Sequence, residues 1–207
     1  KHPQLTACNR EVTIYNRYTQ QKVQTIMFGS NSYLGATIFP EAIQKAIEVT
    51  KELGIGSGGV PLLSGTFMYQ QELEHLIAKM SGMDDSISDR SNLFSSGYTA
   101  NLGVISGLIR ANNLIIHDKL NHASLLDGTV MSGAKMIRYK HGDISHLESL
   151  LKDNSPKYPE GILVVTDGVF SMDGDIAKLP LILETIRKYN AVLLIDEAHA
   201  TGVIGDN

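Results

Sequence analysis

The sequence has little of what would indicate a cross-linked, metal-stabilised or membrane-spanning protein. Its 207 residues include one cysteine, Cys8, and no tryptophan. One thiol supplies neither an internal disulfide framework nor a structural zinc site, so we expect no bound metal. The apolar runs fall far short of the ~20 residues that cross a bilayer, and the first residues lack the pattern of a secretory signal. We therefore expect a cytoplasmic protein without a membrane span.

Charge of one sign is also lacking. The 18 basic and 22 acidic residues give a net charge of −4, and no basic block interrupts the chain. This composition favours no nucleic-acid partner. Hydrophobic residues make up 43% of the sequence and charged residues 19%, which excludes a disordered or fibrous chain. The length suffices for one large domain or two small ones.

Helical and strand-like patterns alternate along most of the chain. Pro40 opens the first helix and Gly54 closes it, as is usual for these two residue types. Helices are expected at 40–53, 99–109, 124–131, 145–152 and 181–188, and a further helix is expected to end near residue 82. Strands are expected at 114–117, 135–139, 162–166 and 192–196. This alternation predicts an α/β fold with a mostly parallel sheet flanked by helices. Before it, the residues up to 35 predict a small hairpin or arm.

Four polar clusters lie where expected strands or loops lead into helices. In open α/β sheets, ligands bind outside the carboxyl ends of the strands. The clusters are Ser95-Ser96-Gly97-Tyr98, Asn121-His122-Ala123-Ser124, residues 167–175 and Asp196-Glu197-Ala198-His199. Their positions predict a ligand site at that edge of the sheet.

Each cluster also has a purely structural interpretation. Residues 95–98 could cap a helix or hold a phosphate with free backbone amides. Asp196, at the end of an apolar strand, could cap the next helix or pair with a ligand cation, with His199 beside it. His122 could cap a helix, stack on a planar ligand or transfer a proton. The residues alone leave these alternatives open.

Two familiar motifs are excluded by their context. The letters Asp-Glu-Ala-His at 196–199 also spell a helicase box, but the chain has no Gly-Lys dipeptide from which to build a phosphate-binding P-loop. The glycine-rich stretch 54–59 follows an expected helix, whereas a dinucleotide-binding loop must follow a strand. Its glycines are better explained by unusual backbone angles or by close approach of neighbouring groups.

Taken together and in this order, the clusters resemble the α-oxoamine synthases, which are pyridoxal-phosphate enzymes of the aspartate-aminotransferase fold (fold type I). The matching stretches are residues 30–35, 54–59, 64–66, 121–124, 167–175 and 196–202. The resemblance implies an N-terminal arm or small-domain segment at 1–35 and an incomplete cofactor-binding large domain at 36–207. It also implies pyridoxal 5′-phosphate as the cofactor and a homodimer.

The resemblance assigns roles to individual residues. Gly97 and Tyr98 match the loop whose amides hold the cofactor phosphate. His122 matches the histidine that stacks on the pyridine ring close to the substrate, which makes it the catalytic candidate. Asp196 matches the carboxylate that keeps the pyridine nitrogen protonated.

Three further residues receive roles in the same way. Ser171 and His199 match side chains that reach the phenolic oxygen of the cofactor. Asn31 resembles an asparagine near the active site, where substrate would bind.

The implied reaction is the decarboxylative condensation of an amino acid with an acyl-CoA, which yields an aminoketone, coenzyme A and CO₂. Some motifs favour 8-amino-7-oxononanoate synthase, and other motifs favour glycine C-acetyltransferase or serine palmitoyltransferase. A non-catalytic subunit of the same fold is a further alternative.

The sequence departs from the family pattern in several places. The family's catalytic lysine follows the segment that matches 196–199, and we expect that this chain stops before it. Pro61 stands where several members have arginine, and Gln70 where most have histidine. Residues 86–92 form a longer segment than usual before the phosphate loop.

Overall fold

The computed structural model describes residues 1–82 and 91–205. Most of segment 86–92, which the sequence marks as unusually long, lies outside these ranges. Residue contacts group the chain into two compact units, Lys1–Asn92 and Leu93–Asn207. The division at residue 35 is inferred from the family resemblance and not from residue contacts, and it stays a prediction.

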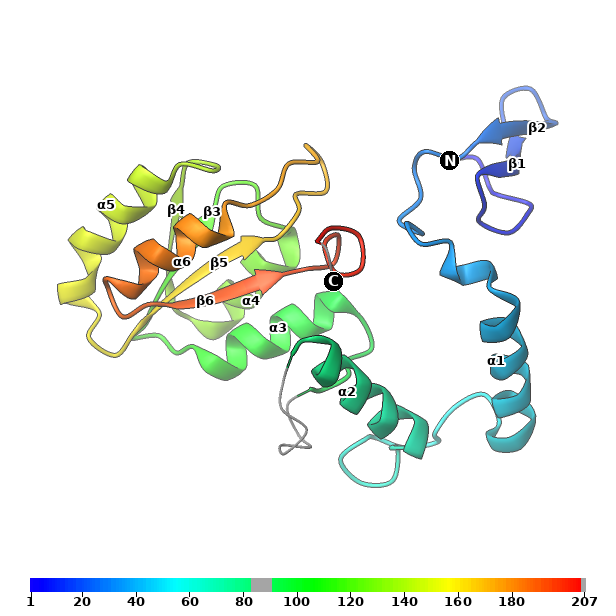
Figure 1. Ribbon diagram of the computed structural model, residues 1–207, viewed down its shortest axis with the longest axis horizontal. Helices are drawn as coiled ribbons and strands as arrows, with labels where there is room; N and C mark the ends of the chain where they lie inside the picture. The colour runs from blue at the N-terminus through cyan, green and yellow to red at the C-terminus, as the bar shows by residue number, and fades with distance from the viewer. Residues whose placement is uncertain (83–90, 206–207) are drawn as a thin grey trace. The chain divides into compact units, whose positions relative to one another are not determined.

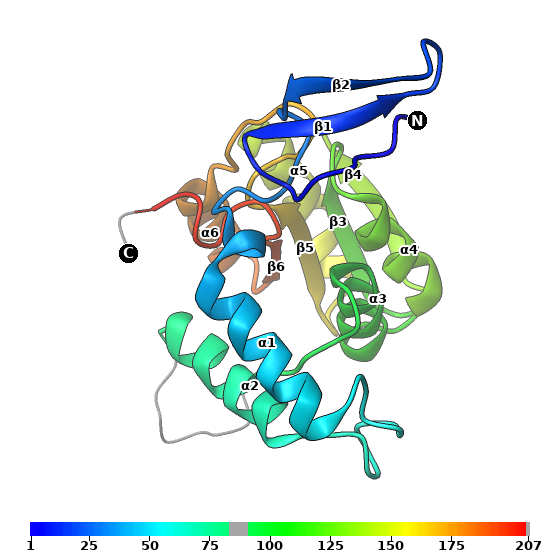
Figure 2. The same ribbon diagram turned by 90° about the vertical axis from the view of Figure 1, so that its right-hand side faces the viewer.

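The first unit contains the predicted hairpin. Strands β1 (Glu11–Asn16) and β2 (Gln21–Ile26) pair antiparallel, and Figure 2 shows them side by side. A short 3₁₀ helix η1 (Ala36–Ile38) is followed by helix α1 (Pro40–Leu53) and helix α2 (Met68–Met80). The Gln70 side chain accepts the backbone N–H of Phe67 at 2.6 Å, so this departure from the family pattern serves the start of α2.

The glycine-rich loop between α1 and α2 is explained by backbone geometry. Gly54 and Gly58 have positive φ angles of 82° and 67°, which favour glycine. A Cβ atom at Gly65 would lie 2.0 Å from the carbonyl oxygen of Gly59. The loop follows a helix and not a strand, as the sequence pattern predicts.

The second unit is a parallel α/β sheet with helices on both faces (Figure 1). Its strands run in the order β4-β3-β5-β6, and all three pairings are parallel. The elements are α3 (Gly97–Leu108), β3 (Leu114–Asp118), α4 (Ala123–Ser132), β4 (Lys135–Tyr139), α5 (Ile144–Asn154), η2 (Ser155–Lys157), β5 (Ile162–Asp167), α6 (Leu179–Arg187) and β6 (Val192–Asp196). The predicted α/β class and the four expected strands are confirmed.

Side chains of the central strands alternate between two cores. Leu114 and Ile116 of β3 belong to a cluster with residues of α5 and α6, whereas Ile115 belongs to one with residues of α3 and α4. Because neighbouring strand residues point to opposite faces, a strand buried on both sides is apolar at nearly every position. This burial holds the parallel strands in register, so that their carboxyl ends lie along one edge. In the described ranges, no helix combines the length and apolar character needed to cross a membrane.

Candidate functional site

Residues from all four polar clusters border one cavity of about 390 Å³ in the second unit. It lies where β5 and β6 end and where α3 and α4 begin. The residues that line it are Gly97, Tyr98, Ala100, Asn101, His122, Ser124, Asp167, Val169, Ile195, Asp196, Glu197, Ala198 and His199. The position is the one expected for a ligand site in a parallel sheet.

The start of α3 supplies backbone donors to this cavity. Ser96 caps the helix, since its side chain accepts the N–H of Thr99 at 3.2 Å. Gly97 and Tyr98 form the first turn, in which backbone N–H groups have no intrahelical acceptor. A Cβ atom at Gly97 would meet no described atom within 4 Å, so packing within the protein does not require glycine here. The capping and anion-binding interpretations are therefore compatible.

Tyr98 ties α3 to α4 beside the cavity. Its hydroxyl donates to a carboxylate oxygen of Asp127, and this hydrogen bond raises the pKa of the phenol. The Tyr98 ring also lies edge-on to the His122 ring, with centroids 6.4 Å apart. Two aromatic rings therefore stand together at this wall.

His122 caps α4 and lines the cavity at the same time. Its Nδ1 accepts the backbone N–H of Ser124 at 3.3 Å and lies 2.7 Å from the Ser124 hydroxyl. The His122 backbone N–H donates to Asp167 at the end of β5. The cap interpretation is thus correct in geometry, and it does not remove the imidazole from the cavity.

Asp196 ends β6 and has both carboxylate oxygens occupied by donors. Oδ1 accepts the N–H of Ala198 at 3.0 Å, and Oδ2 accepts from Nδ2 of Asn101 at 2.7 Å. The side chain is half-buried and faces the cavity. A half-buried carboxylate held by neutral donors provides the negative charge that a ligand cation would pair with.

Asp167 places a second carboxylate next to Asp196. The two residues are direct neighbours in the β5–β6 pairing. Burial raises the pKa of Asp167 from 3.8 to about 6, and the negative charge of Asp196 adds to the rise, although the N–H of His122 opposes it. The native state therefore holds the Asp167 proton more tightly than the unfolded chain does.

The product of the complete reading frame is called the full-length protein below. In this protein without cofactor, we expect Asp167→Asn to reduce the dependence of the free energy of unfolding on pH. Because the folded pKa is raised, the contribution of Asp167 is largest below about pH 4 and is lost as the pH rises through about 6. The rise of the pKa of Asp167 from 3.8 to about 6 corresponds to roughly 3 kcal/mol of unfolding free energy. Urea denaturation across this range measures it. Asp153→Asn, at an exposed carboxylate of α5, is the control and should leave the slope unchanged. Equal slopes for Asp167→Asn and wild type would contradict the expectation.

The remaining predicted site residues have different surroundings. His199 lines the cavity, whereas exposed Ser171 is not among the described residues that line it. Ser171 follows β5 in the loop that leads to α6. Asn31 is exposed and belongs to the first unit. Five of the seven predicted residues therefore share one cavity, and the roles of all seven stay predictions.

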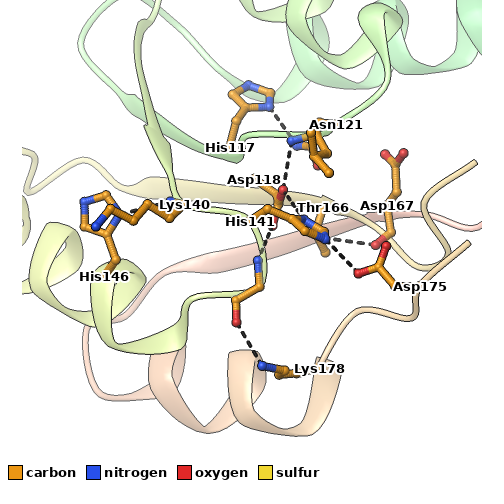
Figure 3. A network of polar contacts seen from close by, with 12 residues as sticks. His117, Asp118, Asn121, Lys140, His141, His146, Thr166, Asp167, Asp175 and Lys178 are labelled. Carbon is orange, nitrogen blue, oxygen red and sulfur yellow. Dashed lines mark hydrogen bonds and ion pairs between the residues drawn. The ribbon is translucent and has the colours of Figure 1, made fainter. Parts of the chain in front are cut away.

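A separate network of polar side chains lies at the same edge of the sheet, around His141 (Figure 3). The His141 ring bridges two carboxylates, with Nδ1 2.8 Å from Asp118 and Nε2 2.7 Å from Asp175. Burial by itself lowers the pKa of His141, but the hydrogen bonds to Asp118 and Asp175 outweigh it and raise the pKa above its ordinary value. This arrangement ties the ends of β3 and β4 to the loop that carries Ser171.

Asn121 connects the His122 turn to β5. Its Nδ2 donates to the carbonyl of Val165 at 2.8 Å and lies 3.0 Å from Nδ1 of His117 (Figure 3). Burial, aided by the charge of Arg138, lowers the pKa of His117 to about 4, so this imidazole is neutral at physiological pH. His117 is therefore a structural histidine of β3.

The sequence interpretation assigned no role to Asn101, Ser124 or Asp167. Asn101 stands four residues after Gly97, which places both on one face of α3. Ser124 and Asp167 belong to clusters already singled out as polar. Helical spacing from Gly97 is the signal that could have identified Asn101.

Comparison with known proteins agrees with this geometry. The family Aminotransferase class I and II matches residues 23–207. The 8-amino-7-oxononanoate synthase of Thermoanaerobacter pseudethanolicus is 41% identical over 184 residues, which cover 89% of this chain and 45% of that protein. The chain thus spans about half the length of the curated relatives that it matches.

Solved structures give the same result. Serine palmitoyltransferase of Sphingomonas wittichii superposes with a TM-score of 0.81 at 33% identity, covering 91% of this chain and 44% of the other. A structure of SPT with PLP matches with a TM-score of 0.81 at 32% identity, covering 94% of this chain and 46% of the other.

Proposed function

Because the chain belongs to the class I and II aminotransferase family, and within it to the α-oxoamine synthases, we propose that it carries the cofactor site of a pyridoxal-phosphate acyltransferase. The full-length protein would condense an amino acid with an acyl-CoA and release coenzyme A and CO₂. An 8-amino-7-oxononanoate synthase-like activity is favoured, since curated relatives with that name are 38–41% identical to the chain.

The observation that carries this proposal is the set of polar groups that line the cavity. Asp196 offers a carboxylate to a protonated ring nitrogen, and the first turn of α3, at Gly97 and Tyr98, offers N–H groups to a phosphate. His122 and His199 add imidazoles on the same walls. The residues therefore fit a planar cationic ring that carries a phosphate.

The protein residues would act mainly by binding and orientation. When bound, pyridoxal phosphate supplies an electron sink for the α-carbon of the amino acid. Asp196 would hold the proton at the ring nitrogen, and His122 would stack against the ring, close enough to substrate to exchange a proton. We propose that Ser171 and His199 reach the phenolic oxygen and that Asn31 approaches the substrate, as the family resemblance implies.

Serine palmitoyltransferase-like activity is the second candidate, because structures of that enzyme superpose closely on this chain. A panel of amino acids and of acyl-CoAs of increasing chain length, supplied to the full-length protein, separates the two. The mass of the product identifies both substrates. Absence of any aminoketone would contradict the enzymatic proposal.

We expect borohydride reduction of the full-length protein with pyridoxal phosphate to attach the cofactor to a lysine outside residues 1–207. Of the described residues that line the cavity, none is lysine, and no lysine of 1–207 stands in the family's motif. Peptide mapping locates the label. Specific labelling of one lysine within 1–207 would contradict the expectation, and no labelling at all would favour a non-catalytic subunit.

Two further properties are proposed. A homodimer is proposed from the family resemblance, and light scattering of the full-length protein tests it. A cytoplasmic location is proposed from the composition, and cell fractionation tests it.

A further inference from the structure

A chain of hydrogen bonds connects Asp196 to His122 through two residues to which no role has been assigned. Nδ2 of Asn101 lies 2.7 Å from Oδ2 of Asp196 and 2.9 Å from Oγ of Ser124. Oγ of Ser124 lies 2.7 Å from Nδ1 of His122. These four residues come from α3, the start of α4 and the end of β6, and all of them line the cavity.

The chemistry of the groups determines the direction of each hydrogen bond. A carboxylate only accepts, so the Asn101 amide nitrogen must donate to Asp196, and its second hydrogen is then available to Ser124. The Ser124 hydroxyl accepts that hydrogen and directs its own toward Nδ1 of His122. The Ser124 backbone N–H also donates to Nδ1. An atom that accepts from two donors carries no hydrogen, so neutral His122 has its hydrogen on Nε2.

Burial makes this arrangement obligatory for Ser124. Its side chain is fully buried, and a buried hydroxyl requires hydrogen-bond partners. Replacement by alanine would remove both the acceptor for Asn101 and the hydroxyl donor to His122. Asn101 acts on Asp196 in a similar way, because it holds Oδ2 while the N–H of Ala198 holds Oδ1. The plane of the carboxylate is thereby defined from two sides.

We propose that Asn101 and Ser124 are positioning residues of this site, which set the plane of the Asp196 carboxylate and the tautomer of His122. The part of this inference that concerns the cofactor rests on the proposed function. The Asn101 amide thus links Asp196, which would hold the ring nitrogen, through Ser124 to His122, which would stack on the ring. Neither positioning residue takes or gives a proton in the reaction.

The first test reads the tautomer without cofactor. In full-length protein labelled with ¹⁵N-histidine, two-bond ¹H–¹⁵N spectra above the titration range distinguish Nδ1–H from Nε2–H, and His122→Asn identifies the signals. We expect Nε2–H in wild type and a mixture of tautomers in Ser124→Ala. Ser132→Ala removes the half-buried hydroxyl of a different serine of α4, outside the cavity, and should leave the pattern of wild type. Nδ1–H in wild type, or an unchanged pattern in Ser124→Ala, would overturn the proposal for His122.

The second test measures binding of pyridoxal phosphate by fluorescence titration. We expect Asn101→Leu to weaken binding by roughly tenfold or more, because a hydrogen bond to a charged group is lost. Ser106→Ala, which removes a hydroxyl from the same helix outside the cavity, is the matched control. Equal affinities of Asn101→Leu and wild type would overturn the role toward Asp196. If wild type binds no pyridoxal phosphate, the proposed function fails, and the histidine spectra still decide the inference about Ser124.

Discussion

Asp196→Asn should lower the turnover of the full-length protein by roughly a hundredfold or more, equivalent to about 2.7 kcal/mol. The carboxylate of Asp196 is the group that would keep the ring nitrogen of the cofactor protonated. An amide has a similar shape but carries no charge. It also offers one acceptor where Ala198 and Asn101 both donate, so one of these hydrogen bonds is lost.

Steady-state kinetics separates this role from simple binding. Because the ring proton matters most when negative charge develops at the α-carbon, the loss should fall on kcat, with a smaller change in KM for the amino acid. Glu184→Gln removes the same charge from an exposed position on α6 and should behave like wild type. If Asp196→Asn binds cofactor and turns over normally, then Asp196 only organises the turn after β6.

Asp118→Ala should destabilise the protein by about 3 kcal/mol or more, because three hydrogen bonds to a buried carboxylate are lost and each such bond contributes about 1.5–3 kcal/mol. The Asp118 side chain is 2% exposed and lies 2.8 Å from the His141 ring. It also accepts the backbone N–H groups of Leu120 and Gly142. Alanine at this position removes the acceptor of three donors, one just after β3 and two just after β4. Urea denaturation of the cofactor-free full-length protein measures the loss.

The same substitution should change the dependence of stability on pH. Since the folded pKa of His141 is raised, its contribution is fully present below the ordinary value of 6.5 and is lost as the pH rises through the folded pKa. This decline should be smaller in Asp118→Ala, because only Asp175 then remains to raise the pKa of His141. Glu148→Ala, which removes an exposed ion pair with Lys188, is the control, because exposed pairs contribute little. A loss no larger than in the control would show that Asp118 is dispensable.

Local patterns in the sequence were sufficient for the elements of this fold. The Pro40 and Gly54 signals bound α1, and the apolar runs at 114–117 and 162–166 correspond to β3 and β5. These predictions succeed because a central parallel strand is buried on both faces and must be apolar throughout. Family motifs then indicated five of the residues that line the cavity.

Only the tertiary structure decided how those elements and residues meet. Asn101 and Asp196 are 95 residues apart, and their contact depends on the order β4-β3-β5-β6 and on α3 packing beside the end of β6. His141 likewise joins Asp118 to Asp175 across 23 and 34 residues. No local pattern reports such contacts, because burial and hydrogen bonding between distant segments arise only when the sheet is assembled. The sequence by itself determined which residues reach the carboxyl edge of the sheet, and the packing determined which of them act together.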